Sequence, residues 1–254
     1  MEELFLLGGH DLEMMTIASL LVGKGRRYVD RNLFWGARLS SYNDILNEWA
    51  GKAGMTIYGI ELIEDDAAVV PPNYRRIDHH NRMSQAPTAL EQVAAILGHP
   101  LSRYEQLVAA NDSGYIPAME ALGAAPEEIA AIRAADRKAQ GVTEEEEKYA
   151  ARSVQDIRQC GAITLLYTHA HHFSPLVDRL YPYRQLLIRS DRELVYYGAG
   201  VSVLVKAFSK WVDTGAAFYG GGESGFFGIA EGRFGQEKLK EIETDIIKLL
   251  NHDL

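Results

Sequence analysis

The sequence predicts an α/β protein with an N-terminal, mostly parallel sheet flanked by helices, a helical connector and a smaller C-terminal α/β domain. In the first half, short apolar runs alternate with helix-like segments, which is typical of βα units around a parallel sheet. The middle stretch is polar and helix-prone, and strand signals resume beyond it. These three observations divide the chain into a domain over residues 1–125, a connector over 126–159 and a second domain over 160–254.

The first domain is expected to begin with a buried strand over residues 3–7, which ends at Gly8-Gly9. The predicted elements that follow are helices over 12–22 and 42–53, a strand over 55–63, a strand leading to Asp78, a helix over 88–97 and an apolar segment over 104–110. Ligands of open α/β sheets gather at the carboxyl ends of the strands. Residues 8–13, Glu61 and residues 78–81 fall at such ends and are therefore the first places to look for a site.

The connector contains four consecutive glutamates at 144–147, which we interpret as the solvated first turn of a helix capped by Thr143 and Glu146. Beyond the connector, strands are predicted over 162–167, 184–188, 193–197 and 216–219. A glycine-rich loop over 220–225 and an amphipathic helix over 236–250 complete the predicted elements.

Composition narrows the class of protein. The chain has 254 residues, is 47% hydrophobic and carries a formal net charge of −9, which argues against a partner that is a long nucleic acid. No apolar run reaches the roughly 18 to 20 residues of a membrane span. The first residues are acidic where a secretory signal would be basic. The single cysteine, Cys160, supports neither an internal disulfide nor a cysteine zinc site. We therefore expect a cytoplasmic protein.

The most informative motif is Asp78-His79-His80-Asn81. Histidine and carboxylate bind transition metals and move protons near neutral pH. Further acids adjoin other apolar runs, at Asp11 with Glu13, at Glu61 and at Asp112. Simpler interpretations exist for some of them, because His10 or Asp11 could cap the helix over 12–22 and Asp112 precedes a Ser-Gly turn signal.

The order of these motifs resembles that of the DHH phosphoesterase superfamily. The likeness is strongest at residues 78–81 and in the small-residue helix start over 86–93. Asn111-Asp112-Ser113-Gly114 is similar to the fourth motif of the family, and Gly220-Gly221-Gly222-Glu223 to its C-terminal glycine loop. The departures are glutamates at Glu13 and Glu61 in place of aspartates, Leu7 at a usual histidine position, and Glu223 where histidine is common.

The resemblance implies a metal-dependent phosphoester hydrolase that acts on a small phosphorylated substrate, such as a nucleotide or short oligonucleotide, with one or two Mn²⁺ or Mg²⁺ ions. The implied metal ligands are His10, Asp11, Glu13, Glu61, His79 and Asp112. Adjacent residues of an extended segment point in opposite directions. His80 should therefore stand beside the metals as a catalytic donor, with Asp78 orienting its neighbours. The alternatives are a divergent, catalytically reduced member that senses a nucleotide or metal, and a one-metal hydrolase of another substrate.

The C-terminal domain is expected to select the substrate. The candidates for substrate binding are Asn81, His169, His171, His172, Gly220, Gly221, Gly222, Glu223 and Ser224. Bare backbone amides of a glycine-rich loop can hold a phosphate, although an ordinary tight turn explains the same sequence. The histidines could equally form a second metal site or a solvated strand end. A homodimer is left open.

Overall fold

The structure is a computed structural model that describes residues 2–34, 36–80, 83, 85–221 and 225–252. The chain divides into two compact units, Met1–Gln140 and Gly141–Leu254. The stretch 126–159 contributes one helix to the first unit, and two helical segments and the start of a strand to the second. Each unit has its own sheet, as expected for a two-domain α/β protein.

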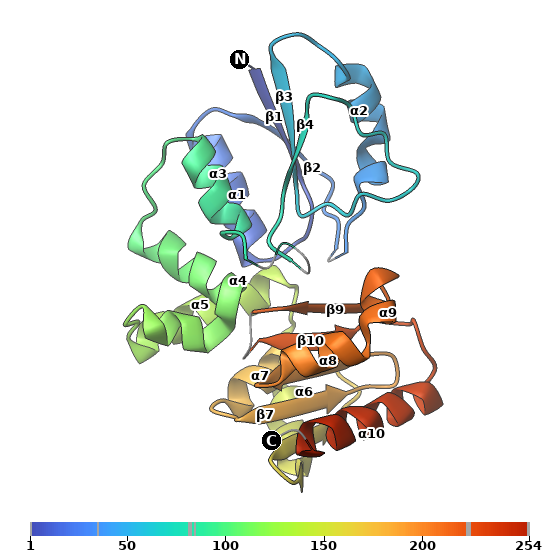
Figure 1. Ribbon diagram of the computed structural model, residues 1–254. Helices are drawn as coiled ribbons and strands as arrows, with labels where there is room; N and C mark the ends of the chain where they lie inside the picture. The colour runs from blue at the N-terminus through green and yellow to red at the C-terminus, as the bar shows by residue number, and fades with distance from the viewer. Residues whose placement is uncertain (1, 35, 81–82, 84, 222–224, 253–254) are drawn as a thin grey trace. The chain divides into compact units, whose positions relative to one another are not determined.

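The N-terminal unit is built on a four-stranded sheet in the order β2-β1-β3-β4, and every neighbouring pair is parallel. Its strands are β1 (Glu2–Leu7), β2 (Arg27–Asp30), β3 (Met55–Ile60) and β4 (Tyr74–Ile77). Its helical elements are α1 (Leu12–Gly23), η1 (Leu39–Tyr42), α2 (Asn43–Trp49), α3 (Ala89–Ile96), α4 (Arg103–Ala121) and α5 (Pro126–Ala139). Helices α1 and α3 lie on one side of the sheet and α2 on the other (Figure 1).

Apolar side chains on both faces of this sheet explain why it needs helices on each side. Leu6 and Ile57 are fully buried in a cluster with Tyr42 and Leu46 of η1 and α2. On the α1 side, Ile17 is also fully buried. Each such side chain stabilises the fold by roughly 1.5–3 kcal/mol relative to an exposed one. The layers are thus held by burial, while the strand ends remain available for polar residues.

The C-terminal unit has a six-stranded mixed sheet in the order β5-β6-β7-β8-β10-β9, in which only β6 and β7 pair in parallel. The strands are β5 (Arg158–Cys160), β6 (Ile163–Tyr167), β7 (Gln185–Arg189), β8 (Leu194–Gly198), β9 (Ala217–Gly220) and β10 (Phe226–Ile229). The helical elements are α6 (Glu144–Ser153), η3 (Val154–Asp156), α7 (Ser174–Leu180), α8 (Val201–Ala207), α9 (Ser209–Asp213) and α10 (Gln236–His252). Helices α8 and α10 cover one face of the sheet, where Leu204, Ile242 and Ile246 are fully buried (Figure 1).

Several elements differ from the sequence expectation. Helix α2 stops at Trp49 rather than continuing to residue 53, because Gly51 and Gly54 adopt positive φ values of 66° and 76°. Strand β3 ends at Ile60 rather than at residue 63, since Glu61 also has a positive φ, of 51°. The apolar segment 104–110 is the beginning of the long helix α4.

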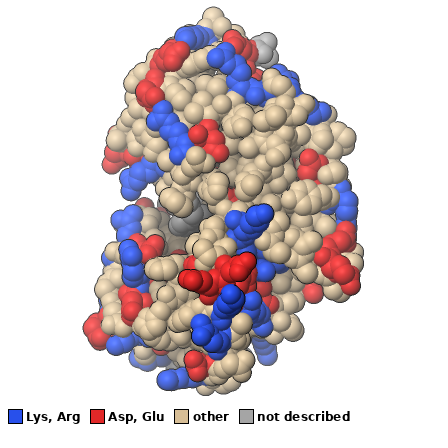
Figure 2. Space-filling view, turned by 180° about the vertical axis from the view of Figure 1, so that it is seen from behind, with Lys and Arg blue, Asp and Glu red and all other residues tan. Residues whose placement is uncertain are grey.

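Surface properties bear on partners. None of the helices in the described part of the chain combines the length and apolar composition needed to cross a bilayer. Figure 2 shows Lys and Arg side chains interspersed with Asp and Glu side chains. Among the described residues on the face in view, they form no continuous basic band of the kind a long nucleic acid requires.

Candidate metal centre

The candidate site lies at the carboxyl edge of the N-terminal sheet, where three strands end in register. Leu7 of β1 pairs with Ile60 of β3, and Ile60 pairs with Ile77 of β4. The residues that follow these three positions therefore leave the sheet side by side. They are the three segments at which the sequence predicts a site, namely residues 8–13, the segment that begins at Glu61, and residues 78–81.

The backbone of the first segment, at Gly8, packs closely against the backbone at the start of the second segment, at Ile60 and Glu61. A Cβ atom on Gly8 would lie 2.4 Å from the Ile60 carbonyl oxygen and 2.5 Å from that of Glu61, so only glycine fits there. Asp11 then caps α1, with its Oδ1 accepting a hydrogen bond of 2.8 Å from the Met14 amide. The chain is thus redirected into α1 directly at the sheet edge.

Glu13 is a buried carboxylate on the first turn of α1, with a relative exposure of 2%. Its Oε1 accepts a hydrogen bond of 2.8 Å from the Leu90 amide at the start of α3. Its Oε2 has no hydrogen-bond partner. The glutamate arm therefore spans from α3, which fixes one oxygen, to the strand edge, where the other oxygen remains available.

Glu61 follows β3 in a backbone conformation that is uncommon for a residue with a side chain, at φ +51°. Its amide donates to the Ile77 carbonyl at 2.8 Å, which ties the turn to β4. Its Oε1 lies 3.2 Å from His79 Nε2. A strained residue at a strand end is typical of functional sites, where surrounding contacts maintain the unfavourable backbone.

His79 and His80 lie on the same side of the chain, contrary to the expectation that they point in opposite directions. Strand β4 ends at Ile77, so the alternation of an extended strand no longer applies. The two ring centroids are 4.3 Å apart. His80 Nδ1 lies 3.7 Å from Glu61 Oε1. Both imidazoles therefore face the same carboxylate.

Asp78 orients His80. Its Oδ1 accepts a hydrogen bond of 2.9 Å from the His80 amide and lies 3.2 Å from His80 Nδ1. Its Oδ2 pairs with the Arg76 guanidinium. Burial raises the pKa of Asp78, but the contacts with His80 and Arg76 outweigh burial and hold it well below its usual range. Sequence reasoning missed one further contact, in which the Gln92 side chain of α3 donates to the Asp78 carbonyl at 3.1 Å.

Asp112 belongs to a helix rather than to a strand end or a turn, and that part of the sequence prediction was wrong. Helix α4 is started by a capping box between Ser102 and Glu105, and it continues past Asp112 before its backbone breaks at Gly114 and Tyr115. Asp112 Oδ2 lies 2.6 Å from His79 Nε2. The acid therefore reaches the sheet edge from a packed helix.

Four ligand atoms converge at this edge, one each from Glu13, Glu61, His79 and Asp112, and all lie within 4.8 Å of one another. Glu61, His79 and His80 form a second, overlapping group. The four atoms are buried. Although His79 Nε2 lies close to the carboxylate oxygens, none of the four atoms has a hydrogen-bond partner of acceptable geometry among the described residues. Buried polar atoms are rarely left this way, unless an ion or water completes the site. The donor set of oxygens and one imidazole nitrogen suits Mn²⁺ or Mg²⁺.

The electrostatics of the group also favour a cation. Burial raises the pKa of Glu13 well above its usual value, and the neighbouring Asp112 and Glu61 raise it further. Although burial disfavours the charged imidazole, contacts with Asp112 and Glu61 raise the pKa of His79 to about 10. Burial likewise raises the pKa of Asp112, but the His79 contact overcomes that effect and lowers it. Without an ion, protons partly neutralise the crowded carboxylates.

Two residues of the implied ligand set lie outside the convergent group. His10 is exposed. Asp11 serves as the helix cap, although burial and the nearby carboxylates of Glu61 and Asp112 raise its pKa well above the usual value. Asn81, a predicted substrate-binding residue, falls outside the described residues.

The predicted substrate-binding residues of the C-terminal unit are spread over three places. His169 and His171 line a cavity of about 130 Å³ with Asp191, Glu193 and Glu231. His172 instead contacts Glu146 of α6 at 2.7 Å. Gly220 ends β9 and Gly221 follows it, while Gly222, Glu223 and Ser224 lie outside the described residues.

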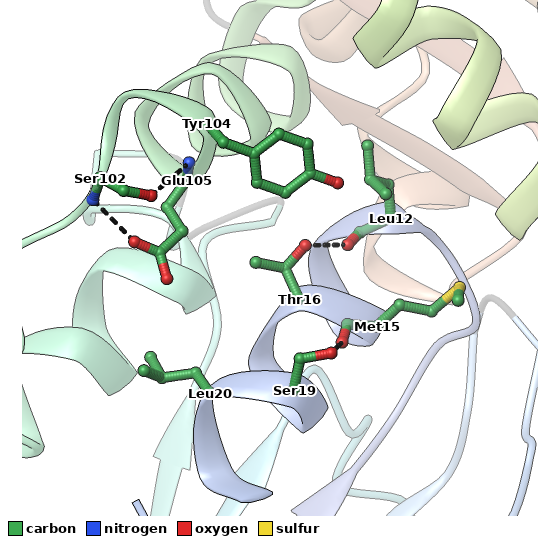
Figure 3. A pocket seen from close by; sticks show the side chains of 8 residues that line it. All are labelled: Leu12, Met15, Thr16, Ser19, Leu20, Ser102, Tyr104 and Glu105. Carbon is green, nitrogen blue, oxygen red and sulfur yellow. Dashed lines mark hydrogen bonds between the residues drawn. The ribbon is translucent and has the colours of Figure 1, made fainter. Parts of the chain in front are cut away.

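A larger pocket of about 360 Å³ lies between α1 and the start of α4 (Figure 3). Three of its polar side chains are already engaged locally. Thr16 donates to the Leu12 carbonyl, Ser19 donates to the Met15 carbonyl, and Glu105 accepts from the Ser102 amide. No sequence motif falls in this pocket, so the convergent group at the sheet edge remains the better candidate.

Comparison with known proteins bears on the fold. No protein-family model and no curated protein sequence matches the chain. The DHH domain of a member of a family of ribosomal proteins superposes with a TM-score of 0.55 at 10% identity, covering 97% of this chain and 87% of that one. The chain therefore has a DHH-phosphoesterase-like fold, as the resemblance implied.

Two further solved structures superpose less closely. A pGpG-specific phosphodiesterase, PggH from Vibrio cholerae, has a TM-score of 0.46 at 14% identity over 100% of both chains. RecJ from Thermus thermophilus in complex with Mn²⁺ has a TM-score of 0.46 at 12% identity, and this chain covers 52% of its length. Similarity at this level does not carry over the substrate of either enzyme.

Proposed function

We propose that this protein is a metal-dependent hydrolase of phosphoester bonds in a small phosphorylated substrate. The observation that carries the proposal is the set of four buried, mutually facing ligand atoms from Glu13, Glu61, His79 and Asp112, which lack directional hydrogen bonds. They come from α1, from the segments after β3 and β4, and from α4, so their convergence is a property of the fold rather than of one local motif. The DHH-phosphoesterase-like fold is consistent with this chemistry.

Glu13, Glu61, His79 and Asp112 would hold the ion. When bound, such an ion lowers the pKa of a water molecule and neutralises charge on phosphoryl oxygens. The ion is Mn²⁺ in our proposal, or Mg²⁺, with one or two per chain. Glu13 offers a single free oxygen because Leu90 holds the other. A site with such fixed, longer arms suits an ion that tolerates irregular geometry better than Mg²⁺ does.

His80 is the catalytic residue beside the ligands. Burial disfavours its charged form, but the hydrogen bond with Asp78 and the charges of Glu61 and Asp112 raise its pKa to about 9. In the proposed reaction, His80 donates a proton to a phosphoryl oxygen or to the leaving group. Asp78 holds the ring in the orientation that this donation requires.

The substrate is small in this proposal, such as a nucleotide or a short oligonucleotide. The formal net charge of −9 disfavours a long nucleic acid. We assign substrate selection to the C-terminal unit, through His169 and His171 and through the glycine-rich loop that begins at Gly220. Replacement of Gly221 by a bulkier residue should then raise KM or change substrate preference more than it weakens metal binding.

A second candidate function is a nucleotide or metal sensor with little turnover. The observation that favours it is the use of Asp11 as a helix cap, which leaves the convergent group with fewer carboxylates than the family pattern implies. Such a sensor needs a ligand that binds two states of the protein with different affinity. Metal binding without turnover would support this function.

The decisive experiment combines metal content with turnover. Purified protein is loaded with Mn²⁺, its metal content is measured by mass spectrometry, and hydrolysis of a phosphodiester reporter and of short oligonucleotides is followed. We expect His79→Ala and Asp112→Ala to lose bound metal and at least about 100-fold in turnover while they remain folded.

The matched control is His99→Ala. His99 also pairs with a carboxylate of the N-terminal unit, Glu105, at 3.1 Å, but lies outside the convergent group. Its metal content should equal that of the wild type. Unchanged metal stoichiometry in both His79→Ala and Asp112→Ala would refute the ligand assignment.

A further inference from the structure

A buried ion pair on α5 contacts residues that are adjacent in the sequence to two of the candidate metal ligands. Arg133 and Asp136 have relative exposures of 4% and 5%, and Arg133 Nη1 donates to Asp136 Oδ2 at 2.6 Å. Charged residues are seldom buried to this extent, and a buried pair stabilises a fold little because desolvation offsets the attraction. The pair therefore calls for an explanation other than stability.

The Arg133 side chain contacts residues of α4 before and after Asp112 in the sequence. Its Nη1 donates to Asn111 Oδ1 at 2.8 Å. Its guanidinium also lies over the Tyr115 ring, 4.1 Å from the ring centroid. Asp112, which contributes a ligand atom, lies between these two contacts in the sequence. One side chain thus holds both ends of the short segment that carries the ligand.

That segment is the irregular part of α4, and this is why its position needs fixing. Gly114 has φ −160° and ψ 18°, and Tyr115 has φ +62° and ψ −147°. A positive φ is unfavourable for tyrosine and persists only where surrounding contacts maintain it. The stacking of Arg133 on the ring is such a contact. Without it, the helix break and the neighbouring Asp112 would have alternative arrangements.

Asp136 makes the corresponding contact with α1. Its Oδ1 accepts a hydrogen bond of 3.4 Å from the Leu12 amide, one of the free N–H groups at the start of that helix. A carboxylate is favoured at this position by the helix dipole. Leu12 immediately precedes Glu13, the ligand on α1. The same ion pair therefore contacts the backbone or side chain next to two of the four ligands.

We propose that Arg133 and Asp136 are positioning residues that set the relative placement of Asp112 and Glu13 for metal binding. The inference rests on the proposed metal site. The contacts of the pair with Asn111, Tyr115 and Leu12 fall on neighbours of the ligands, so the two residues act through these neighbours. Residues that orient ligands in this way typically change metal affinity by about 10-fold to 100-fold when they are replaced.

The test replaces the pair by apolar residues of similar size, Arg133→Met with Asp136→Leu, so that no unpaired charge is buried. Mn²⁺ affinity is measured by isothermal titration calorimetry, and thermal unfolding is measured without metal. We expect Mn²⁺ to bind about 10-fold to 100-fold more weakly and the unfolding midpoint to stay within a few degrees of wild type. Activity should recover at high Mn²⁺ concentration, which loss of folding could not produce.

Arg103→Gln is the matched control, because Arg103 also joins α4 to α5 through Glu128, at 3.1 Å, but on the exposed surface. Its Mn²⁺ affinity should equal that of wild type. If the double variant fails to fold, Asn111→Ala decides, and a loss of Mn²⁺ affinity in the same direction is expected. Wild-type affinity in the folded variant would overturn the positioning role alone. A wild-type protein that binds no Mn²⁺ would overturn the proposed function together with it.

Discussion

Metal binding at this site should release protons, so the apparent affinity for Mn²⁺ should rise steeply with pH. Without an ion, contacts with Asp112 and Glu61 raise the pKa of His79 to about 10 against the effect of burial. The nitrogen that would bind the ion is then protonated at neutral pH. Binding must displace that proton, and the pKa of Glu13, raised by burial, adds to the protons held by the group.

The size of the effect follows from proton competition. One competing proton with a pKa near 10 weakens binding about tenfold for each pH unit below that value, or about 1.4 kcal/mol. Between pH 7 and pH 9 the affinity should therefore rise about 100-fold. The affinity for Mn²⁺ should rise with pH, because low pH favours the protonated state of the group, which repels the cation. The protons are shared by the interacting residues of the group. Where Glu13 also loses a proton, the logarithm of the Mn²⁺ binding constant should rise by more than one per pH unit.

Isothermal titration calorimetry provides the assay. Mn²⁺ is titrated at several pH values between 7 and 9, in pairs of buffers that differ in their heat of ionisation. The dependence of the measured heat on the buffer gives the number of protons released. His99→Ala should behave as wild type, since its imidazole lies outside the group. A Mn²⁺ affinity independent of pH, with equal heats in both buffers, would refute the reasoning.

Three further predictions concern single residues. His80→Ala should lower turnover about 100-fold or more while bound Mn²⁺, counted by mass spectrometry, stays near wild type; loss of the metal would make His80 a ligand. Ile57→Ala, at a position with 0% exposure, should destabilise the N-terminal unit by about 2–5 kcal/mol in urea unfolding, and a smaller change would show that the cavity collapses. Burial, aided by Glu231, raises the pKa of Glu193 from 4.5 to about 7, so its folded state keeps a proton that the unfolded state loses. The free energy of unfolding of the C-terminal unit should therefore fall as the pH rises from 4.5 to about 7. Glu193→Gln should remove that dependence on pH. A wild-type melting temperature that stays constant across this pH range would contradict the prediction.

The sequence was informative where local pattern and tertiary role coincide. The apolar run of β1 lies in the sheet interior, and the pattern predicted it because its burial is nearly continuous. The motif that contains His79 was placed correctly at a strand end, because it follows Ile77, the last residue of β4. Thr88 begins α3 with a capping box to Glu91, a signal that is wholly local.

Features set by distant neighbours were missed or misplaced. Strand β2 is largely exposed, and it forms because its backbone pairs with β1 rather than because of its side chains. Asp112 lies in the capped helix α4 rather than in a turn, and the Ser113-Gly114 signal that follows it marks the break in that helix. Arg133 and Asp136 look like ordinary surface charges of a polar helix. Only packing against α1 and α4 reveals their burial.

The backbone of Glu61 has a consequence for how this protein tolerates mutation. Its φ of +51° costs on the order of 1 kcal/mol for a residue with a side chain. Glycine or asparagine would relieve that cost and would also remove a carboxylate from the crowded edge. A library selected only for thermal resistance should therefore enrich Gly or Asn at position 61, whereas a library selected for turnover should retain Glu. Divergent enrichment of this kind would mark the residue as one retained for chemistry at the expense of folding stability.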